Sequence, residues 1–410
     1  MPQFIPLQFY HYNWLDKRIN PEKVISPPYD VLSPDDKKAL AREEFNVVHL
    51  DSPASYEEAA IKLNSWILDN ILSQDPVPCF YIMATDYKAG NTTKTRWGIY
   101  GGMRVHPFED KKVFPHEQTY SRAKNDRLQL MMATHGQLSP IFGIYDDPEL
   151  ILENIGRQNL ETPPLISFYQ EPDVVNRIWP VPVHHNQSIE NLILNKKVFI
   201  ADGHHRYETA LNYINMMPNS QNAPWNHVYV YLSNISSPGL EIFPYHRILS
   251  RKKTFNWNRI IKKAESDFYI SSSDKLAQFS GQWRADSFAL YTEKNFVFFT
   301  PKIHPRNIFS RIGAHVLDKM FLRGAMELSD QDLASGEFIS YTHEQEVIFT
   351  KVDSGDAQAG FILRPVPMDV LQKVCETGNV MPRKSTFFYP KLPTGVLFHL
   401  WGGRPLSLDE

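Results

Sequence analysis

The chain has 410 residues, which is more than one compact core usually holds, so we expect two or three structural units. Hydrophobic residues make up 42% and charged residues 22% of the sequence, the composition of a folded water-soluble protein. The formal net charge of -3 argues against a protein that coats nucleic acid, because such domains carry a basic excess. A nucleic-acid partner is therefore unexpected, and the motifs described below predict a small-molecule partner.

The sequence lacks the marks of secretion and membrane insertion. Cys79 and Cys375 form no zinc-binding spacing, and two cysteines do not make a disulfide framework. The first residues lack the basic region and apolar core of a signal peptide. No apolar run approaches the length that crosses a bilayer. We expect a cytoplasmic protein without a membrane partner.

Two helices are predicted early in the chain. Ser33 has the character of an N-cap, and Pro34 occupies the first helical position, so a helix is expected to run to about Arg42. A second helix is expected near 55–72, where apolar residues recur on one face.

Strands are predicted to follow. Residues 79–85 and 96–105 are expected to pair, with a turn at 91–93 between them. Residues 115–139 are dense in polar side chains and are expected to be partly helical. A further strand is expected at 140–145.

The sharpest local signal is a strand that turns through glycine into a helix. Residues 198–200 are expected to form a short apolar strand, Asp202-Gly203 a turn, and a helix to begin at about His204. Such a helix start presents free backbone N–H groups and partial positive charge to one spot. The segment therefore predicts a site for an anionic substrate, a phosphate.

Side chains at this turn add to that expectation. Arg206 binds phosphate oxygens in a fork, and Asp202 is placed to hold a metal ion or to orient a hydroxyl group. His204 and His205 diverge by about 100° on a helix, so they do not chelate one zinc ion. The alternative is that Asp202 only caps the helix and Arg206 makes a surface ion pair.

Two other segments carry related chemistry. In 115–127, His116 stands beside Glu117, a carboxylate that could act as general base for a hydroxyl nucleophile. The segment 378–395 carries four groups suited to phosphate: Lys384, Ser385, Thr386 and Lys391. Taken alone, the first is better explained as a solvated loop with ordinary ion pairs, and the second is a weak signal that an ordinary loop entering a strand also explains. The sequence contains no GxxxxGK[ST] loop, no GxGxxG after a strand and no kinase catalytic-loop pattern.

A change of pattern near residue 250 divides the chain. Beyond it, helices and strands alternate, with elements at 291–300, 346–352 and 359–364. We expect an N-terminal lobe, 1–250, that carries DGHHR, and a C-terminal α/β lobe, 251–410, that carries MPRKST. The order of elements predicts a mixed α/β, or α+β, fold class.

The strand followed by DGHHR resembles the ParB and sulfiredoxin-like fold, and within it the free-serine kinases of archaea. Those kinases carry a Pro-His-Glu-Gln segment, then DGHHR after a strand, then a Lys-Thr-Thr type segment. The counterparts here, in the same order, are Pro115 to Gln118, Asp202 to Arg206, and Lys384 to Thr386. The resemblance implies a ParB/sulfiredoxin-like mixed core with insertions.

Over its whole length the chain also resembles a bacterial and archaeal family known as domain of unknown function 1015. The residues that carry this match are Pro27-Pro28-Tyr29-Asp30, His116-Glu117, Lys124, Asp126-Arg127, Ala201 to Arg206, His246-Arg247 and 381–391.

The kinase resemblance implies phosphoryl transfer to an alcohol group, with free L-serine as the favoured acceptor and O-phosphoserine as the product. It implies that Glu117 takes the hydroxyl proton and that Asp202 orients the acceptor or a Mg²⁺-bound group. The groups expected to bind substrate or phosphate are His116, Gly203, His204, His205, Arg206, Lys384, Ser385, Thr386 and Lys391.

The cofactor and the reaction are open at this point. Mg²⁺ is expected, and the donor is ATP, ADP or pyrophosphate, because the sequence has no recognisable nucleotide cradle. A phosphatase or nucleotidase would use water in place of serine at the same site. A nucleotide-binding module of the ParB type is a third reading, against which the net charge weighs.

Overall fold

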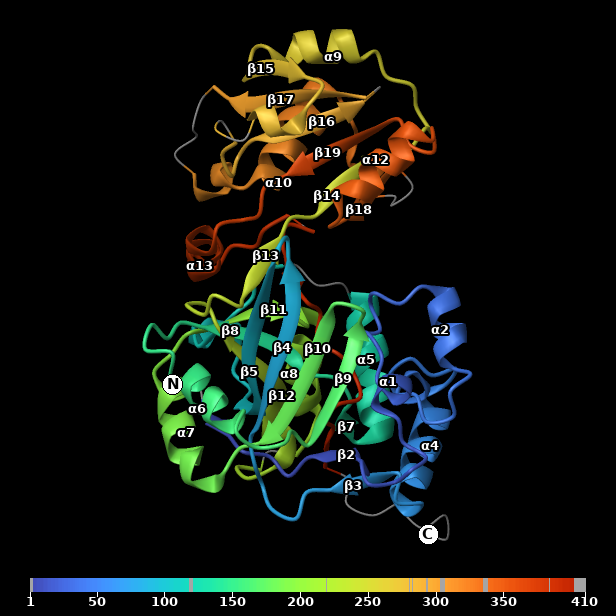
Figure 1. The fold of residues 1–410 in the computed structure, drawn as a ribbon, viewed down its shortest axis with the longest axis vertical. Helices are drawn as coiled ribbons and strands as arrows, with labels where there is room; N and C mark the ends of the chain where they lie inside the picture. The colour runs from blue at the N-terminus through green and yellow to red at the C-terminus, as the bar shows by residue number, and fades with distance from the viewer. Residues whose placement is uncertain are drawn as a thin grey trace. The chain divides into compact units, whose positions relative to one another are not determined.

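The structure is a computed structural model, and it describes residues 3–117, 121–218, 220–279, 281, 283–292, 294–302, 307–334, 338–382 and 384–401. These residues cluster into two compact units (Figure 1). The first contains residues 3–240 and 390–401, and the second contains residues 241–389. The predicted division into lobes 1–250 and 251–410 stays a prediction.

A nine-stranded mixed sheet organises the described part of the first unit. Its strands are β1 (Phe4–Ile5), β4 (Tyr81–Ala89), β5 (Thr92–Arg104), β6 (Val113–Phe114), β8 (Ile141–Tyr145), β9 (Ile166–Glu171), β10 (Val174–Pro180), β11 (Val198–Asp202) and β12 (His227–Asn234). The order is β6-β11-β8-β12-β5-β4-β10-β9, with β1 on β5. The pairs β6–β11 and β8–β12 are parallel, and the others are antiparallel.

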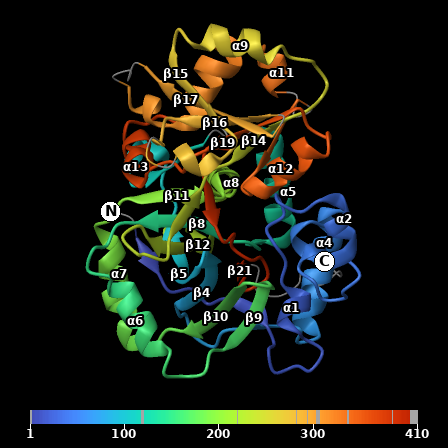
Figure 2. The same ribbon diagram turned by 45° about the horizontal axis from the view of Figure 1, so that its top comes forward.

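Two short strand pairs and several helices complete this unit. The pairs are β2 (Tyr10–Tyr12) with β3 (Leu72–Gln74), and β7 (Gly136–Gln137) with β21 (His399–Leu400). The helices are α1 (Pro21–Val24), α2 (Pro34–Leu40), α3 (Val48–Asp51), α4 (Tyr56–Leu68), α5 (Ser121–Thr134), α6 (Ile151–Asn159), α7 (Asn186–Leu194) and α8 (His204–Met216), with short 3₁₀ turns at Phe108–Asp110, Val183–His185 and Pro224–Asn226. In both views α6 and α7 lie next to one another at one side of the sheet, and α2 and α4 lie at the other (Figures 1 and 2).

The two faces of the large sheet are covered differently. One face packs against α6, α7 and α8 in a single apolar core that includes Trp97, Ile155, Ile189 and Tyr207. The opposite face contacts residues that lie outside the helices, among them Phe9 and Pro390. There the ring of Phe9 contacts Tyr81 and Tyr229, and the peptide at Pro390 accepts a hydrogen bond from Arg96.

Local signals were read correctly in this unit. Ser33 caps α2 through a reciprocal hydrogen-bond pair with Asp36, and Pro34 is its first residue. The predicted strand at 140–145 is β8, and the predicted strand-glycine-helix is β11, Gly203 and α8. The expected strand pair is β4 with β5, although Ala89 pairs with Thr92, so the turn is earlier than predicted.

The second unit contains a six-stranded antiparallel sheet in the order β15-β17-β16-β19-β14-β18, and a separate pair, β13 with β20. Its strands are β13 (Glu241–Phe243), β14 (His246–Leu249), β15 (Phe268–Ser273), β16 (Phe288–Thr292), β17 (Asn295–Pro301), β18 (Ile339–Thr342), β19 (Ala359–Leu363) and β20 (Phe387–Tyr389). Its helices are α9 (Trp257–Ala264), α10 (Gly313–Val316), α11 (Asp330–Ala334), α12 (Gln345–Asp353) and α13 (Met368–Glu376), with a π-helical stretch at Leu317–Ala325 and 3₁₀ turns at Leu276–Phe279 and Ile308–Arg311.

The mixed α+β fold class is therefore confirmed. One element was wrong: residues 291–300 are not one element, because the chain reverses between β16 and β17, where Lys294 has a φ of 62°. An alternating apolar pattern continues across such a tight turn, so periodicity alone did not reveal it. Among the described residues, no helix is long and apolar enough to span a bilayer.

Candidate functional site

A bulge in β11 sets the direction of Asp202. Ile200 pairs with Gly143 and Asp202 with Phe142, so the register shifts between them and one residue of β11 is left over. Side chains two apart in a regular strand share a face, which would place Asp202 with Ile200 in the apolar core. The bulge instead places Asp202 in register with Phe142, on the opposite face of the sheet.

Gly203 makes the turn from β11 into α8. Its φ of 88° lies in the left-handed region, which a residue with a side chain adopts only at a cost. A Cβ at this position would stand 3.0 Å from Nε of Arg206. No described side chain caps α8, so its first N–H groups face the region around Asp202.

Asp202 is the centre of a compact charge cluster. Its Oδ2 lies 2.6 Å from Nζ of Lys391, its Oδ1 accepts the N–H of Gly203 at 2.8 Å, and the Arg206 guanidinium lies 3.8 Å away. Burial raises the pKa of this carboxyl, but the charges of Lys391 and Arg206 outweigh burial and hold it well below its usual range. Asp202 is therefore ionised at neutral pH.

The peptide that carries Lys391 is held by buried polar groups. Arg96, which is fully buried over the Phe142 ring, donates from a guanidinium nitrogen to the Pro390 carbonyl. Gln170 Nε2 donates to the Lys391 carbonyl at 3.0 Å. The Gln170 side chain accepts in turn from Asn176, at 3.1 Å. These contacts fix the backbone from which Lys391 reaches Asp202.

Two buried histidines stand behind this cluster. The backbone N–H of His116 donates to Nε2 of His204 at 3.2 Å, and Nδ1 of His116 lies 2.6 Å from the Ile200 carbonyl. Burial lowers the pKa of His116 to about 4 and that of His204 well below its ordinary value. Both rings are thus neutral at pH 7, and the positive charge of this cluster is that of Lys391 and Arg206.

The roles expected of the remaining site residues stay predictions. Glu117 and His205 are half-buried, and Gln118 lies outside the described residues. Lys384 belongs to the second unit, where its Nζ lies 4.8 Å from the centre of the Tyr245 ring. Ser385 and Thr386 are buried in that unit. Lys391, which also belongs to the predicted segment 378–395, lies in the first unit and contacts Asp202 there.

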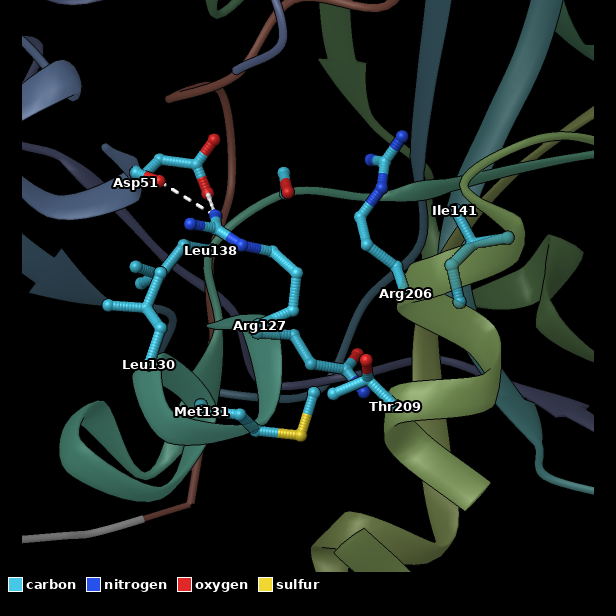
Figure 3. Close-up of a pocket in the computed structure, with 11 residues that line it drawn as sticks. Asp51, Arg127, Leu130, Met131, Leu138, Ile141, Arg206 and Thr209 are labelled. Atoms are coloured by element: carbon cyan, nitrogen blue, oxygen red, sulfur yellow. Dashed lines mark hydrogen bonds and ion pairs between the residues drawn. The ribbon is translucent and has the colours of Figure 1, made fainter. Parts of the chain in front are cut away.

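A small cavity adjoins Arg206 on the side of α5 (Figure 3). Its volume is about 30 Å³, and its charged lining residues are Asp51, Arg127 and Arg206. One water molecule needs roughly 10–15 Å³, so the cavity has room for water but is too small to enclose a nucleotide. Apolar side chains of α5, among them Leu130 and Met131, form its floor.

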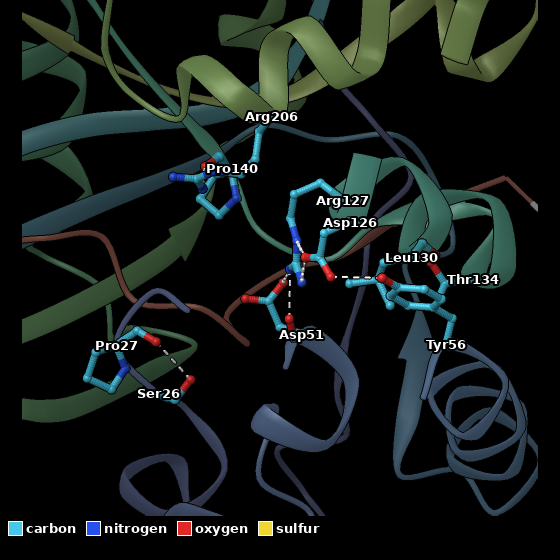
Figure 4. A network of polar contacts seen from close by, with 10 residues as sticks. All are labelled: Ser26, Pro27, Asp51, Tyr56, Asp126, Arg127, Leu130, Thr134, Pro140 and Arg206. Carbon is cyan, nitrogen blue, oxygen red and sulfur yellow. Dashed lines mark hydrogen bonds and ion pairs between the residues drawn. The ribbon is translucent and has the colours of Figure 1, made fainter. Parts of the chain in front are cut away.

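Arg127 links this cavity to the N-terminal segment (Figure 4). It donates to the Asp51 carbonyl at 2.7 Å, lies 3.3 Å from the Asp51 carboxylate, and bonds to Asp126 at 2.9 Å. Its guanidinium carbon lies 4.1 Å from the centre of the Tyr29 ring. Burial raises the pKa of Asp51, against the lowering effect of Arg127 and then of Arg206. Burial likewise raises the pKa of Tyr29 to about 12.

Residues quoted for the family resemblance thus meet in the first unit. Tyr29, Asp126 and Arg127 form one network, and Lys124 pairs with Glu208 of α8 at 2.6 Å. The sequence reasoning did not identify Asp51, Arg96 or Gln170, whose partners are distant in sequence and whose surroundings form no motif. His246 and Arg247 are buried in the second unit, where burial lowers the pKa of Arg247 to about 10.

The described residues contain no group of three or more His, Cys, Asp and Glu side chains arranged to hold a metal ion. Mg²⁺ in phosphoryl-transfer sites is often bound by one or two carboxylates together with substrate phosphates, without a preformed cage. The ionised Asp202 fits that use, since the helix start beside it suits the phosphates.

A family model described as "Protein of unknown function (DUF1015)" matches residues 5–320. The chain belongs to this family. Tyr29, Arg127 and Asp202 lie within the matched DUF1015 residues, and Lys384 and Lys391 lie beyond them. No curated protein matches the chain.

Solved structures similar to this member of DUF1015 include free serine kinases with AMP or ADP bound. A free serine kinase in complex with AMP is 12% identical, with a TM-score of 0.36 over 68% of this chain and 83% of that chain. A conserved hypothetical protein from Pyrococcus furiosus is 14% identical, with a TM-score of 0.36 over 69% and 90%. SbnI with a C-terminal truncation, from Staphylococcus aureus, is 10% identical, with a TM-score of 0.36 over 75% and 90%.

Proposed function

We propose that this protein is a small-molecule phosphotransferase, a kinase that converts free L-serine to O-phosphoserine with ATP, ADP or pyrophosphate as donor. The observation that carries the proposal is the placement of Asp202. A bulge turns this carboxylate out of the core toward Lys391, at the open start of α8 and beside Arg206. An ionised acid, two cations and the N–H groups of a helix start that no described side chain caps are parts that phosphoryl transfer uses.

In the proposed reaction the serine hydroxyl oxygen forms a bond to the terminal phosphorus of the donor. The bond from that phosphorus to the bridging oxygen breaks, and the shortened donor leaves. Glu117 takes the hydroxyl proton, a role that the kinase resemblance implies. Lys391 and Arg206 neutralise the charge on the transferred group, as transfer through a loose transition state requires.

Asp202 orients the reactants. In the free protein its charge is compensated by Lys391 and Arg206. An arriving phosphate competes for these two cations, and the Asp202 carboxylate would then be the group that holds Mg²⁺. When bound, Mg²⁺ supplies charge neutralisation at the phosphates. His116 and His204 stay neutral, so they position the helix start without adding charge.

The test is to incubate purified protein with L-serine, Mg²⁺ and each donor in turn, and to detect O-phosphoserine by mass spectrometry. L-Alanine, which lacks the hydroxyl group, is the matched control acceptor. Phosphoserine with at least one donor supports the proposal, and its absence with all three overturns the serine kinase. Phosphate release that does not depend on serine instead identifies a hydrolase at the same site.

The role of Glu117 has its own test. Glu117→Gln preserves shape and removes the base, so turnover falls at least about 100-fold, the usual worth of a general base. An unchanged rate in this variant would show that another group takes the proton.

A further inference from the structure

A second cleft lies in the first unit, away from Asp202. Residues 3–10, 221–227 and 399–401 form most of its walls, and its volume is about 560 Å³. Small-molecule sites commonly have volumes of about 300–1,000 Å³. Asp202 of β11 pairs with Phe142 of β8, which in turn pairs with Tyr231 of β12. The residue of β12 that lines the cleft is His227. Four residues of β12 separate these rows, roughly 13 Å along the strand.

The charge that lines this cleft has one sign. Its basic side chains are Arg104, His227 and His399, and no Asp or Glu of the described residues lines it. Arg104 is half-buried at the end of β5 and pairs with no carboxylate in the part of the chain that the structure describes. An arginine without an acidic partner on the wall of a cleft favours an anionic occupant.

Two histidine nitrogens on the same wall lack partners. Nε2 of His227 and Nδ1 of His399 are buried without a hydrogen bond to any described residue. Burial, and then the charge of Arg104, lowers the pKa of His227 to about 4, and burial lowers that of His399 to about 4. Both rings are neutral at pH 7, so the fixed charge of the cleft is that of Arg104. Buried polar atoms in native proteins nearly always find a partner.

The remaining walls are suited to a flat apolar body. The rings of Tyr10 and Trp401 line the cleft, together with Leu7 and Pro78. The indole N–H of Trp401 donates to Tyr213 at 3.0 Å, which fixes the orientation of that ring. We infer that the cleft is a binding site for a small organic oxyanion with a planar apolar body, held by Arg104. The inference does not depend on the proposed kinase activity.

The probe for this site is 4-fluorobenzoate, followed by ¹⁹F NMR, with the neutral 4-fluorobenzamide as its isostere. Wild-type protein and Arg157→Gln, which removes an exposed arginine of α6, bind the benzoate saturably and with equal affinity. Arg104→Gln weakens benzoate binding about tenfold, the usual worth of one charge-assisted hydrogen bond. Arg104→Lys retains most of the affinity, because it keeps the charge.

The amide binds more weakly than the benzoate to wild type and is indifferent to Arg104→Gln. Circular dichroism establishes that each variant is folded before it is titrated. Three results would overturn the inference: no saturable benzoate binding to wild type, equal binding by folded Arg104→Gln, or amide binding as tight as that of the benzoate.

Discussion

The buried pair of Arg127 and Asp51 gives a prediction whose size follows from the structure. Both side chains are nearly inaccessible, at 9% and 5% exposure. Arg127→Met removes the cation and leaves the Asp51 carboxylate buried. Two charges 3.3 Å apart attract by about 5 kcal/mol at an effective dielectric constant of 20. Breaking a buried pair in this way is measured at about 3–5 kcal/mol.

Protonation of Asp51 limits that loss. An aspartate with an ordinary pKa of about 3.9 takes a proton at a cost of about 4 kcal/mol at pH 7 and about 1.5 kcal/mol at pH 5. Burial already raises the pKa of Asp51, and the loss of Arg127 raises it further. A raised folded-state pKa means that stability is lost as pH rises through it. Arg127→Met should therefore cost about 3–4 kcal/mol at pH 7 and about 2 kcal/mol less at pH 5.

The measurement is urea unfolding followed by tryptophan fluorescence at both pH values, compared between wild type and variant. Arg157→Met, at an exposed arginine of α6, is the control and should leave the midpoint nearly unchanged. The double variant Arg127→Met with Asp51→Asn should be more stable at pH 7 than Arg127→Met alone, because the buried carboxylate left without Arg127 is then removed. A loss below about 1 kcal/mol at pH 7, or an equal loss at both pH values, would refute the reasoning.

Three further predictions concern the Asp202 site. Lys391→Met raises the pKa of Asp202, because the largest of the charges that oppose burial is removed, and ¹³C NMR titration of the carboxyl checks the shift. A carboxyl whose folded-state pKa is lowered stabilises the protein above its ordinary pKa, so the variant is also less stable than wild type at pH 7. An unchanged titration would contradict the pairing of Lys391 with Asp202. Gly203→Ala costs about 1–2 kcal/mol in urea unfolding because of its positive φ, and a neutral result would refute the strained turn. Gln170→Leu removes a hydrogen bond to the peptide of Lys391, so we expect a lower kcat for phosphoserine formation and a free energy of unfolding that is about 1–3 kcal/mol smaller. An unchanged kcat would show that Lys391 is held in place without Gln170.

Features that depend on neighbouring residues could be predicted from the sequence. The cap of α2 at Ser33, the strand β8 and the strand-glycine-helix at Gly203 follow from rules that span a few residues. The anion-binding role of the α8 start follows from a rule of the same kind and stays a prediction.

Features that depend on distant residues could not be derived from local rules. Lys391 meets Asp202 across 189 residues, and Arg127 meets Asp51 across 76. No periodicity or spacing encodes such a pairing, since tertiary packing decides it. The bulge in β11 was equally hidden, because it arises from the register of two strands and not from the composition of either. In a regular strand without that bulge, the Asp202 side chain would share the core face with Ile200.

The claim that Asp202 serves phosphoryl transfer is tested most directly by Asp202→Asn in the phosphoserine assay. Asp173→Asn is the matched control, since Asp173 is 56% exposed and pairs only with Lys88 among the described residues. Wild type and Asp173→Asn should form O-phosphoserine at equal rates, and Asp202→Asn at least about 100-fold more slowly. Equal turnover by a folded Asp202→Asn variant would contradict the assignment of this site.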